Sequence, residues 1–324
     1  MQLVPAGTQI DFVSQARFFS RLSLVLVTLV SVFMLVAWRM DWINWGIDFR
    51  GGSVIEVKVP EEVGAVDEGR IRQAVAAVGY PGAVIVRIGS AEERAYRINL
   101  VVSEEESKNL AARLVSGLSE QLGAPVSPQR IESIGPRVGR ELRSRGLGAM
   151  LLSWLLILIY IWFRFDLRYA PGAVAALVHD VVITAGVFVM LGLEFNLQVL
   201  AALLVVIGYS LNDTIVIYDR IRENLEERGK THLEDVVNQS INQTLSRTLL
   251  TSLTTLIVVM ALLFLGGPVL RDFALALLIG VSVGTYSTIY VASVLLILLE
   301  RRYGSVRSAA GSPTKAKSKT KTKR

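Results

Sequence analysis

The chain lacks cysteine altogether and has only two histidines among its 324 residues. The absence of cysteine excludes disulfides, thiolate nucleophiles and cysteine-ligated metal sites. Of the two imidazoles, His179 falls inside an apolar run and His232 in a polar segment, and no H-E-x-x-H motif occurs. The glycine pair in DFRGGS (48–53) is not followed by Lys-Ser/Thr, so it is not a phosphate-binding loop. We therefore expect no conventional enzyme, no metal site and no cofactor.

Charged residues are also scarce, at 19% of the chain, whereas 52% of the residues are hydrophobic. This balance is typical of a membrane protein. The net charge of +6 comes largely from the last ten residues, which makes it a poor sign of nucleic-acid binding by a folded domain. We therefore expect the folded chain to contact membrane lipid and not nucleic acid.

Six apolar runs are long enough to cross about 30 Å of hydrocarbon as helices. The first run, 22–38, follows Arg17 and Arg21 as the core of a signal peptide would. It is long, however, and ends in bulky residues without a small-residue cleavage site, which favours a retained anchor. The other five runs cover about 147–163, 171–192, 197–217, 248–266 and 273–299.

Cationic residues predict the orientation of these spans. They gather on one side, which is therefore the cytoplasm, and both termini lie there. The residues concerned are Arg17, Arg21, Arg164, Arg168, Arg220, Arg222, Arg228, Lys230, Arg301 and Arg302. The short links 193–198 and 266–272, and the long segment 40–145, fall on the opposite side. Long domains are translocated regardless of their charge, so the charges of 40–145 do not contradict this orientation.

The segment 40–145 is predicted to fold as a domain. Its alternating and amphipathic patterns follow the order βαββαβ, which is typical of the ferredoxin-like α+β fold. The expected strands are 51–60, 83–89, 94–102 and 129–135, and the expected helices are 68–79 and 103–123. We therefore expect a polytopic α-helical membrane protein with six transmembrane helices and one ferredoxin-like extracytoplasmic domain. Its predicted parts are the N-terminus and first helix (1–39), the outer domain (40–145), a five-helix bundle (146–302) and a disordered basic cytoplasmic tail (303–324).

An ionisable residue, Asp213, lies inside the fourth span beside Asn212. A charge at such a depth costs at least a few kcal/mol, so it indicates a functional site. Asp213 lies six residues before Asp219, or roughly 9 Å inside the cytoplasmic boundary. Arg247 begins the fifth span from the same side, so its long side chain can reach the level of Asp213. Thr251 follows Arg247 on the same helix face.

The third span adds His179 and Asp180, roughly 14 Å deep by the same helical rise. Loss of hydration favours a neutral carboxyl group, whereas a nearby guanidinium favours a charged one. A carboxylate balanced between these effects can switch its protonation when helices shift, as a proton carrier must. Three simpler interpretations stay open. Asp213 and Arg247 could form a static ion pair that fixes helix register, Arg247 could be a boundary residue, and His179 and Asp180 could satisfy polar neighbours in the bundle.

Specific strings give the chain a family resemblance. They are WGIDFRGGS (45–53), SIGPRVGREL (133–142), FRFDLRYAPGAVAALVHDVVITAGVF (163–188), AALLVVIGYSLNDTIVIYDRIREN (201–224), SINQTLSRTLLTSLTTL (240–256) and FALALLIGVSVGTYSTIYVAS (273–293). Through them the chain from about residue 17 to 300 resembles the shorter, SecF-type branch of the SecD/SecF family. That family belongs to the resistance-nodulation-division superfamily of proton-driven membrane proteins.

The resemblance implies a half-transporter of the bacterial cytoplasmic (inner) membrane that is completed by SecD. It implies assistance to the export of unfolded preproteins through SecYEG, driven by the proton-motive force, with YajC as a further expected partner. By motif position, Asp213 resembles the proton-relay carboxylate of the family and Arg247 its basic partner. Asp180, His179, Asn212 and Thr251 are expected to give polar support. Two alternatives are a non-transporting scaffold for SecD and a half-transporter that exports small molecules or lipids.

Overall fold

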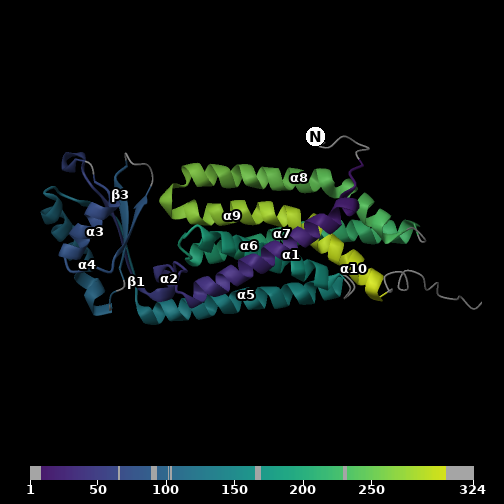
Figure 1. The fold of residues 1–324 in the computed structure, drawn as a ribbon, viewed down its shortest axis with the longest axis horizontal. Helices are drawn as coiled ribbons and strands as arrows, with labels where there is room; N and C mark the ends of the chain where they lie inside the picture. The colour runs from purple at the N-terminus through teal and green to yellow at the C-terminus, as the bar shows by residue number, and fades with distance from the viewer. Residues whose placement is uncertain are drawn as a thin grey trace, which may run out of the picture.

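The computed structural model describes residues 9–64, 66–88, 93–100, 102, 104–164, 169–228 and 232–303. The chain forms an outer domain at one end of the molecule and a bundle of long helices that runs away from it (Figure 1). Residues 304–324, which make up almost all of the predicted basic tail 303–324, lie outside the described residues. Disorder of that tail stays a prediction.

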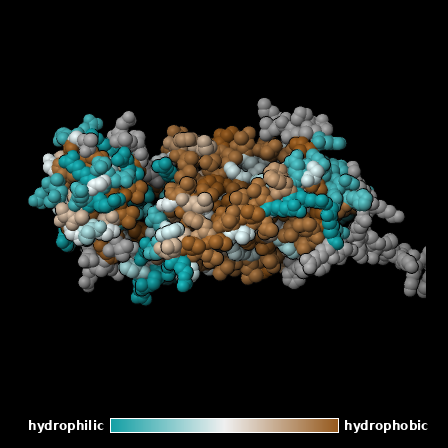
Figure 2. Space-filling view, in the orientation of Figure 1, coloured by the Kyte–Doolittle hydropathy of each residue, from teal (hydrophilic) through white to brown (hydrophobic). Residues whose placement is uncertain are grey.

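Among the described residues, six helical segments are long and apolar enough to cross a membrane. This confirms the six predicted spans. The helices are α1 (Phe12–Arg39), α5 (Pro136–Arg164), α6 (Ala170–Met190), α7 (Leu197–Arg228), α8 (Leu233–Leu265) and α9 (Gly267–Ser287), which continues into α10 (Ser293–Tyr303). Apolar side chains gather over the bundle, and polar ones gather over the outer domain and the opposite end (Figure 2).

The helices of the bundle differ in how much of their apolar surface the chain itself buries. More than half of the most apolar window is buried in α6, α7 and α9, but only 6% of it in α1. Large side chains such as Leu24, Leu155 and Val258 are exposed on α1, α5 and α8. In a membrane this surface meets lipid or another subunit instead of water. The helices α6, α7 and α9 therefore form the interior of the bundle.

The outer domain is a four-stranded antiparallel sheet with the strand order β2-β3-β1-β4. Its strands are β1 (Gly52–Lys58), β2 (Val84–Ile88), β3 (Ala95–Leu100) and β4 (Ser127–Ile134). Helices α3 (Glu68–Ala77) and α4 (Glu104–Leu122) pack on one face through a core that includes Ile55, Ile98 and Leu114. Two split βαβ units produce this strand order, and the ferredoxin-like prediction is confirmed.

A short helix, α2 (Ile47–Arg50), connects the first span to the sheet and was not among the predicted elements. The glycine pair that follows it has a structural explanation. Gly51 has a φ of 79°, and a Cβ atom there would lie 2.6 Å from the Cα atom of Pro136. Glycine is therefore needed both for the left-handed backbone and for the close approach of α2 to the start of α5.

The helices α7 and α8 extend well beyond the predicted spans and form a long hairpin. Polar pairs align the half of this hairpin that lies farther from the outer domain. The Asn224 amide donates to the Ser240 hydroxyl at 2.8 Å, and the Arg220 guanidinium donates to the Gln243 side-chain oxygen at 2.6 Å. The start of α1 and the end of α10 lie at this same end of the bundle, far from the outer domain (Figure 1).

Candidate functional site

Glycines allow α9 and the following segment η2 (Thr288–Ala292) to approach α6 and α7 closely, which brings polar groups together in the bundle. A Cβ atom on Gly284 of α9 would lie 3.2 Å from the Ser210 Cβ atom and 3.5 Å from the Asp180 Oδ2 atom. A Cβ atom on Gly172 of α6 would lie 2.3 Å from the Tyr218 hydroxyl and 2.8 Å from the Ala292 carbonyl oxygen. Small residues at helix contacts permit such distances.

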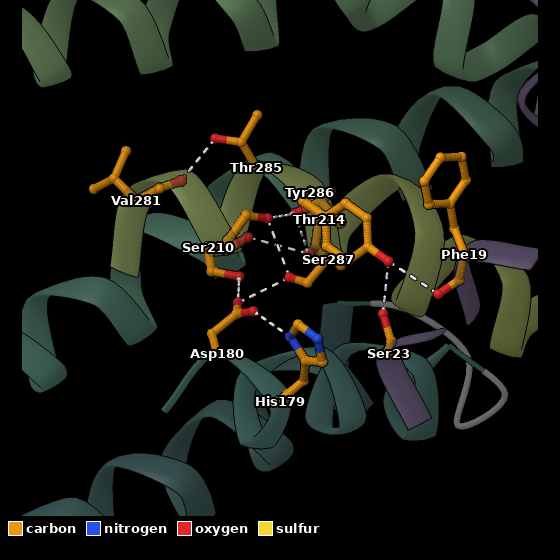
Figure 3. A network of polar contacts seen from close by, with 12 residues as sticks. Phe19, Ser23, His179, Asp180, Ser210, Thr214, Val281, Thr285, Tyr286 and Ser287 are labelled. Atoms are coloured by element: carbon orange, nitrogen blue, oxygen red, sulfur yellow. Dashed lines mark hydrogen bonds and ion pairs between the residues drawn. The ribbon is translucent and has the colours of Figure 1, made fainter. Parts of the chain in front are cut away.

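Asp180 is the centre of a buried hydrogen-bond network (Figure 3). Its side chain is fully buried, and its Oδ2 atom accepts hydrogen bonds from Ser210 of α7 at 2.6 Å and Ser287 of α9 at 2.9 Å. Its Oδ1 atom lies 2.9 Å from the Nδ1 atom of His179. A buried carboxylate with this many partners is well satisfied. Asp180 therefore holds three helices together.

The network reaches α1 through an aromatic residue of α9. The Tyr286 ring lies 6.1 Å from the His179 ring, centroid to centroid. The Tyr286 hydroxyl donates to the Phe19 carbonyl oxygen at 2.9 Å and lies 2.8 Å from the Ser23 hydroxyl (Figure 3). The first span is thus joined to the interior helices by side-chain hydrogen bonds as well as by packing.

Asp213, the other carboxylate of the interior, is placed very differently. It is 2% exposed, and its Oδ2 atom has no hydrogen-bond partner among the described residues. The hydroxyl of Thr248 on α8 is likewise buried without a partner in the described chain. The pairs Tyr209–Ser252 and Asn224–Ser240 flank Asp213 and Thr248 along the hairpin, so the two residues lie at a similar depth. Buried polar atoms without partners are rare and indicate a functional position.

Arg247 does not form a closed ion pair with Asp213. Its nitrogen atoms lie more than 4.0 Å from the carboxylate oxygens, yet its charge acts on Asp213. Arg247 is exposed on the surface of the chain, and so is Asn212. Thr251 is half-buried, and its hydroxyl donates to the carbonyl oxygens of Arg247 and Thr248 within α8.

The predicted site residues therefore fall into two groups. His179 and Asp180 contact each other and join the buried network, whereas Asp213 and Arg247 lie near one another on the α7–α8 hairpin without bonding. Asn212 faces outward, and Thr251 satisfies its own helix. Their roles stay predictions.

Several residues of the site were missed by the sequence analysis. Ser210, Thr214, Tyr286 and Ser287 belong to the polar network, but isolated hydroxyl residues in apolar helices carry no distinctive pattern. The π-helical segment η2 (Thr288–Ala292) between α9 and α10 has no sequence signal either. Its Ala292 carbonyl oxygen accepts a hydrogen bond from the Tyr218 hydroxyl at 3.0 Å. Such π-segments are frequent at functional sites.

The sequence of residues 280–284 fits the G-x-S-x-G pattern of hydrolases, but the structure gives it another meaning. The Ser282 hydroxyl donates to the Leu278 carbonyl oxygen one turn earlier, in the interior of α9. A nucleophile elbow requires a sharp strand-to-helix turn, which is not the backbone found at this position.

Comparisons with known proteins match almost the whole chain. The family described as protein export membrane protein SecD/SecF, C-terminal, matches residues 115–302, and the SecD/SecF GG motif matches residues 42–59. The protein translocase subunit SecF of Magnetococcus marinus is 45% identical over 319 residues, which cover 96% of this chain and 97% of that protein. The corresponding subunit of Vibrio alginolyticus is 43% identical over 298 residues, or 92% of either chain.

Two solved structures are also similar. The crystal structure of SecDF, a translocon-associated membrane protein from Thermus thermophilus, has a TM-score of 0.80 and 40% sequence identity. The match covers 93% of this chain and 40% of that chain. A crystal structure of SecDF in a super-membrane-facing form has a TM-score of 0.67 at 40% identity, over 95% of this chain and 41% of that one. The chain thus spans about two fifths of the SecDF chains that it matches.

Proposed function

Because the chain belongs to the SecD/SecF family of protein export membrane proteins, we propose that it uses the proton-motive force to assist preprotein translocation as the SecF-type half of a complex with SecD. The preprotein would pass through SecYEG, and the complex would act on it at the outer face of the bacterial inner membrane. YajC is a further proposed partner. Both termini are proposed to lie in the cytoplasm, which is supported by the basic residues at that end.

The observation that carries this proposal is the environment of Asp213. A carboxylate whose Oδ2 atom is buried without a hydrogen bond can bind a proton without first breaking one. The Asp180 carboxylate, by contrast, accepts bonds from both serine hydroxyls. Asp213 is therefore the better candidate for a group that gains and loses a proton in each cycle, and Asp180 for one that keeps its state.

The proposed role of Arg247 follows from the distance between its guanidinium group and the Asp213 carboxylate. Because it does not touch Asp213, its attraction acts through space and disappears when Asp213 is protonated. Protonation would then let α7 and α8 shift relative to each other. One charge that crosses 100 mV releases about 2.3 kcal/mol, enough to change a two-state equilibrium about fifty-fold.

The outward-facing polar residues support a partner subunit at this place. Asn212 and Arg247 are exposed on the membrane-spanning part of the chain, where polar groups are costly against lipid. A second subunit packed on the α7–α8 surface would shield them. This agrees with the SecDF structures, in which the matched part is less than half of a longer chain.

The test is proton-dependent export by inverted vesicles that contain the chain with SecD and SecYEG. We expect Asp213→Asn to abolish the part of export that depends on the proton-motive force, and Arg247→Met to reduce it strongly. Asp219→Asn is the matched control, because Asp219 lies on the same helix but pairs with Arg164 at 3.2 Å near the surface.

Undiminished proton-dependent export in Asp213→Asn would refute the relay. If deletion of the chain abolished export while both neutral substitutions left it intact, a scaffold for SecD would be the better description. Proton-driven efflux of small molecules or lipids, without an effect on preproteins, would support the transporter alternative.

A further inference from the structure

The outer domain rests on the bundle through the sheet face that carries no helices. Alternation along β3 points Tyr96 and Ile98 into the core with α3 and α4, where they are 1% and 0% exposed. Arg97 and Asn99 point the other way, since successive side chains of a strand alternate. That second face of the sheet is turned toward the ends of the bundle helices (Figure 1).

A largely buried charged cluster joins this face to the loop between α6 and α7. The Arg97 guanidinium contacts Glu56 of β1 at 3.0 Å and Glu194 of the loop at 3.6 Å. The Asn99 amide lies 3.4 Å from the Glu194 Oε2 atom. The Arg97, Glu56 and Glu194 side chains are only 18%, 9% and 12% exposed. Arg97 is thus shared between the outer domain and the bundle.

Backbone contacts fix the same loop to the segment that follows the first span. The Phe195 amide donates to the Asn44 carbonyl oxygen at 2.8 Å, and the Gly46 amide donates to the Phe195 carbonyl oxygen at 3.0 Å. Gly46 lies close to the loop, because a Cβ atom there would lie 3.0 Å from the Asn196 Cβ atom and 3.3 Å from the Asn196 Cα atom. The loop therefore has little freedom to move without its neighbours.

The loop leads directly into the helix that carries Asp213. The Asp48 carboxylate of α2 accepts a hydrogen bond from the Leu197 amide at 2.8 Å, at the first residue of α7. A carboxylate at a helix N-terminus is a favourable cap. From there α7 runs without interruption to Arg228. A displacement of α7 along its axis would reach Leu197 and Glu194 without being absorbed by a break in the helix.

From these contacts we propose that Arg97 and Glu194, with Asp48 at the α7 N-terminus, form the joint through which α7 moves the outer domain. The proposal rests on the proposed function and adds to it the residues that transmit the motion. Arg97, Glu194 and Asp48 are positioning residues, because none of them receives the transported proton.

The experiment measures two quantities in the same vesicles: proton-driven preprotein export and proton flux through the complex. We expect Arg97→Gln and Glu194→Ala to lower export about fivefold or more, while proton flux stays within about twofold of the unmodified chain. Arg130→Gln is the matched control. Arg130 lies on the same sheet face but pairs with Glu132 of its own strand, so the substitution should change neither quantity.

Two results would overturn the joint. Export that is unchanged in both Arg97→Gln and Glu194→Ala would show that the contact transmits nothing. An equal loss of export and of proton flux would show that the cluster only maintains the fold. Failure of the proposed function gives a different result, because Asp213→Asn then leaves both proton flux and export unchanged. The joint variants can still be compared with the unmodified chain in that case.

Discussion

At the scale of single residues, the two carboxylates of the bundle interior show how neighbours decide what a buried acid can do. Asp180 and Asp213 are both buried in apolar helices at a similar cost of burial. Hydrogen bonds with Ser210, Ser287 and His179 offset that cost for Asp180, whereas the Oδ2 atom of Asp213 has no hydrogen bond that would offset it. The first arrangement stabilises the bundle, and the second suits the proposed role of Asp213 as a proton carrier.

This difference predicts unequal effects of the two alanine substitutions on stability. Asp180→Ala should lower the free energy of unfolding by about 2–3 kcal/mol, because it leaves buried hydroxyls without their acceptor. Asp213→Ala should change it by less than about 1 kcal/mol, because no hydrogen bond at Oδ2 is lost. Thermal unfolding of the purified chain in detergent measures both. Equal destabilisation by the two substitutions would contradict the distinction.

A second prediction at this scale concerns pH. Burial raises the pKa of Glu194 above its ordinary value of 4.5, more than Arg97 and Asn99 lower it, and Asp272 and Asp48 raise it further. The packed joint therefore binds this proton more tightly than the opened joint does. The contribution of this protonation of Glu194 to stability is fully present below pH 4.5, and it is lost as the pH rises through the raised pKa of Glu194.

Glu194→Gln should remove this pH-dependent part of the stability and leave a flatter profile of unfolding temperature against pH. The Gln side-chain oxygen would still accept a hydrogen bond from Asn99. The measurement is the unfolding temperature in detergent at several pH values between about 4 and 8, a range that begins below the ordinary pKa of a glutamate and extends well above it. A profile for Glu194→Gln that is as steep as that of the unmodified chain would contradict the assignment.

At the scale of elements, hydropathy predicted the membrane spans because an apolar run long enough to cross the membrane is rare outside transmembrane helices. The alternation of apolar and polar residues predicted the strands of the outer domain, because successive side chains of a strand point to opposite faces of the sheet. Helix α2 and the π-segment η2 were not predicted, because they depend on contacts between distant segments. The sequence singled out Asp213, Arg247, His179 and Asp180 as polar residues in apolar runs, but it could not reveal that Ser210 and Ser287 converge on Asp180.

The close contact between α6 and η2 gives a prediction for an element. Gly172→Ala should destabilise the bundle by about 1–3 kcal/mol, because the added methyl group would lie 2.3 Å from the Tyr218 hydroxyl. Gly208→Ala on α7 is the matched control, since a Cβ atom there would meet nothing within 4 Å and alanine favours a helix. Unfolding temperatures in detergent compare the two. A Gly172→Ala chain as stable as Gly208→Ala would show that the helices can separate freely.

At the scale of the whole molecule, the polar ends and the apolar middle fix how the chain sits in a membrane (Figure 2). The described helices place the outer domain at one end, and place the start of α1 and the end of α10 at the other (Figure 1). The exposed apolar faces of α1, α5 and α8 require lipid or another subunit around them. The direction of insertion is the part of this arrangement that stays a prediction.

The natural absence of cysteine makes that direction simple to test. A Gly82→Cys variant places one thiol on the outer domain, where glycine has open space around it, and His232→Cys places one before α8. In intact cells, a maleimide that cannot cross membranes should label the first variant and not the second. In inverted vesicles the pattern should reverse. Labelling in the opposite order would overturn the orientation.

The hydrogen bonds around Asp180 have a consequence for the insertion of the chain. Asp180 lies on α6, but its hydroxyl partners Ser210 and Ser287 lie on α7 and α9, which follow later in the sequence. Before those helices pack against α6, the carboxyl group lacks these partners, and an unsatisfied polar group is costly in lipid. A chain that ends before α9 should therefore be retained poorly by the membrane and degraded faster than the full chain.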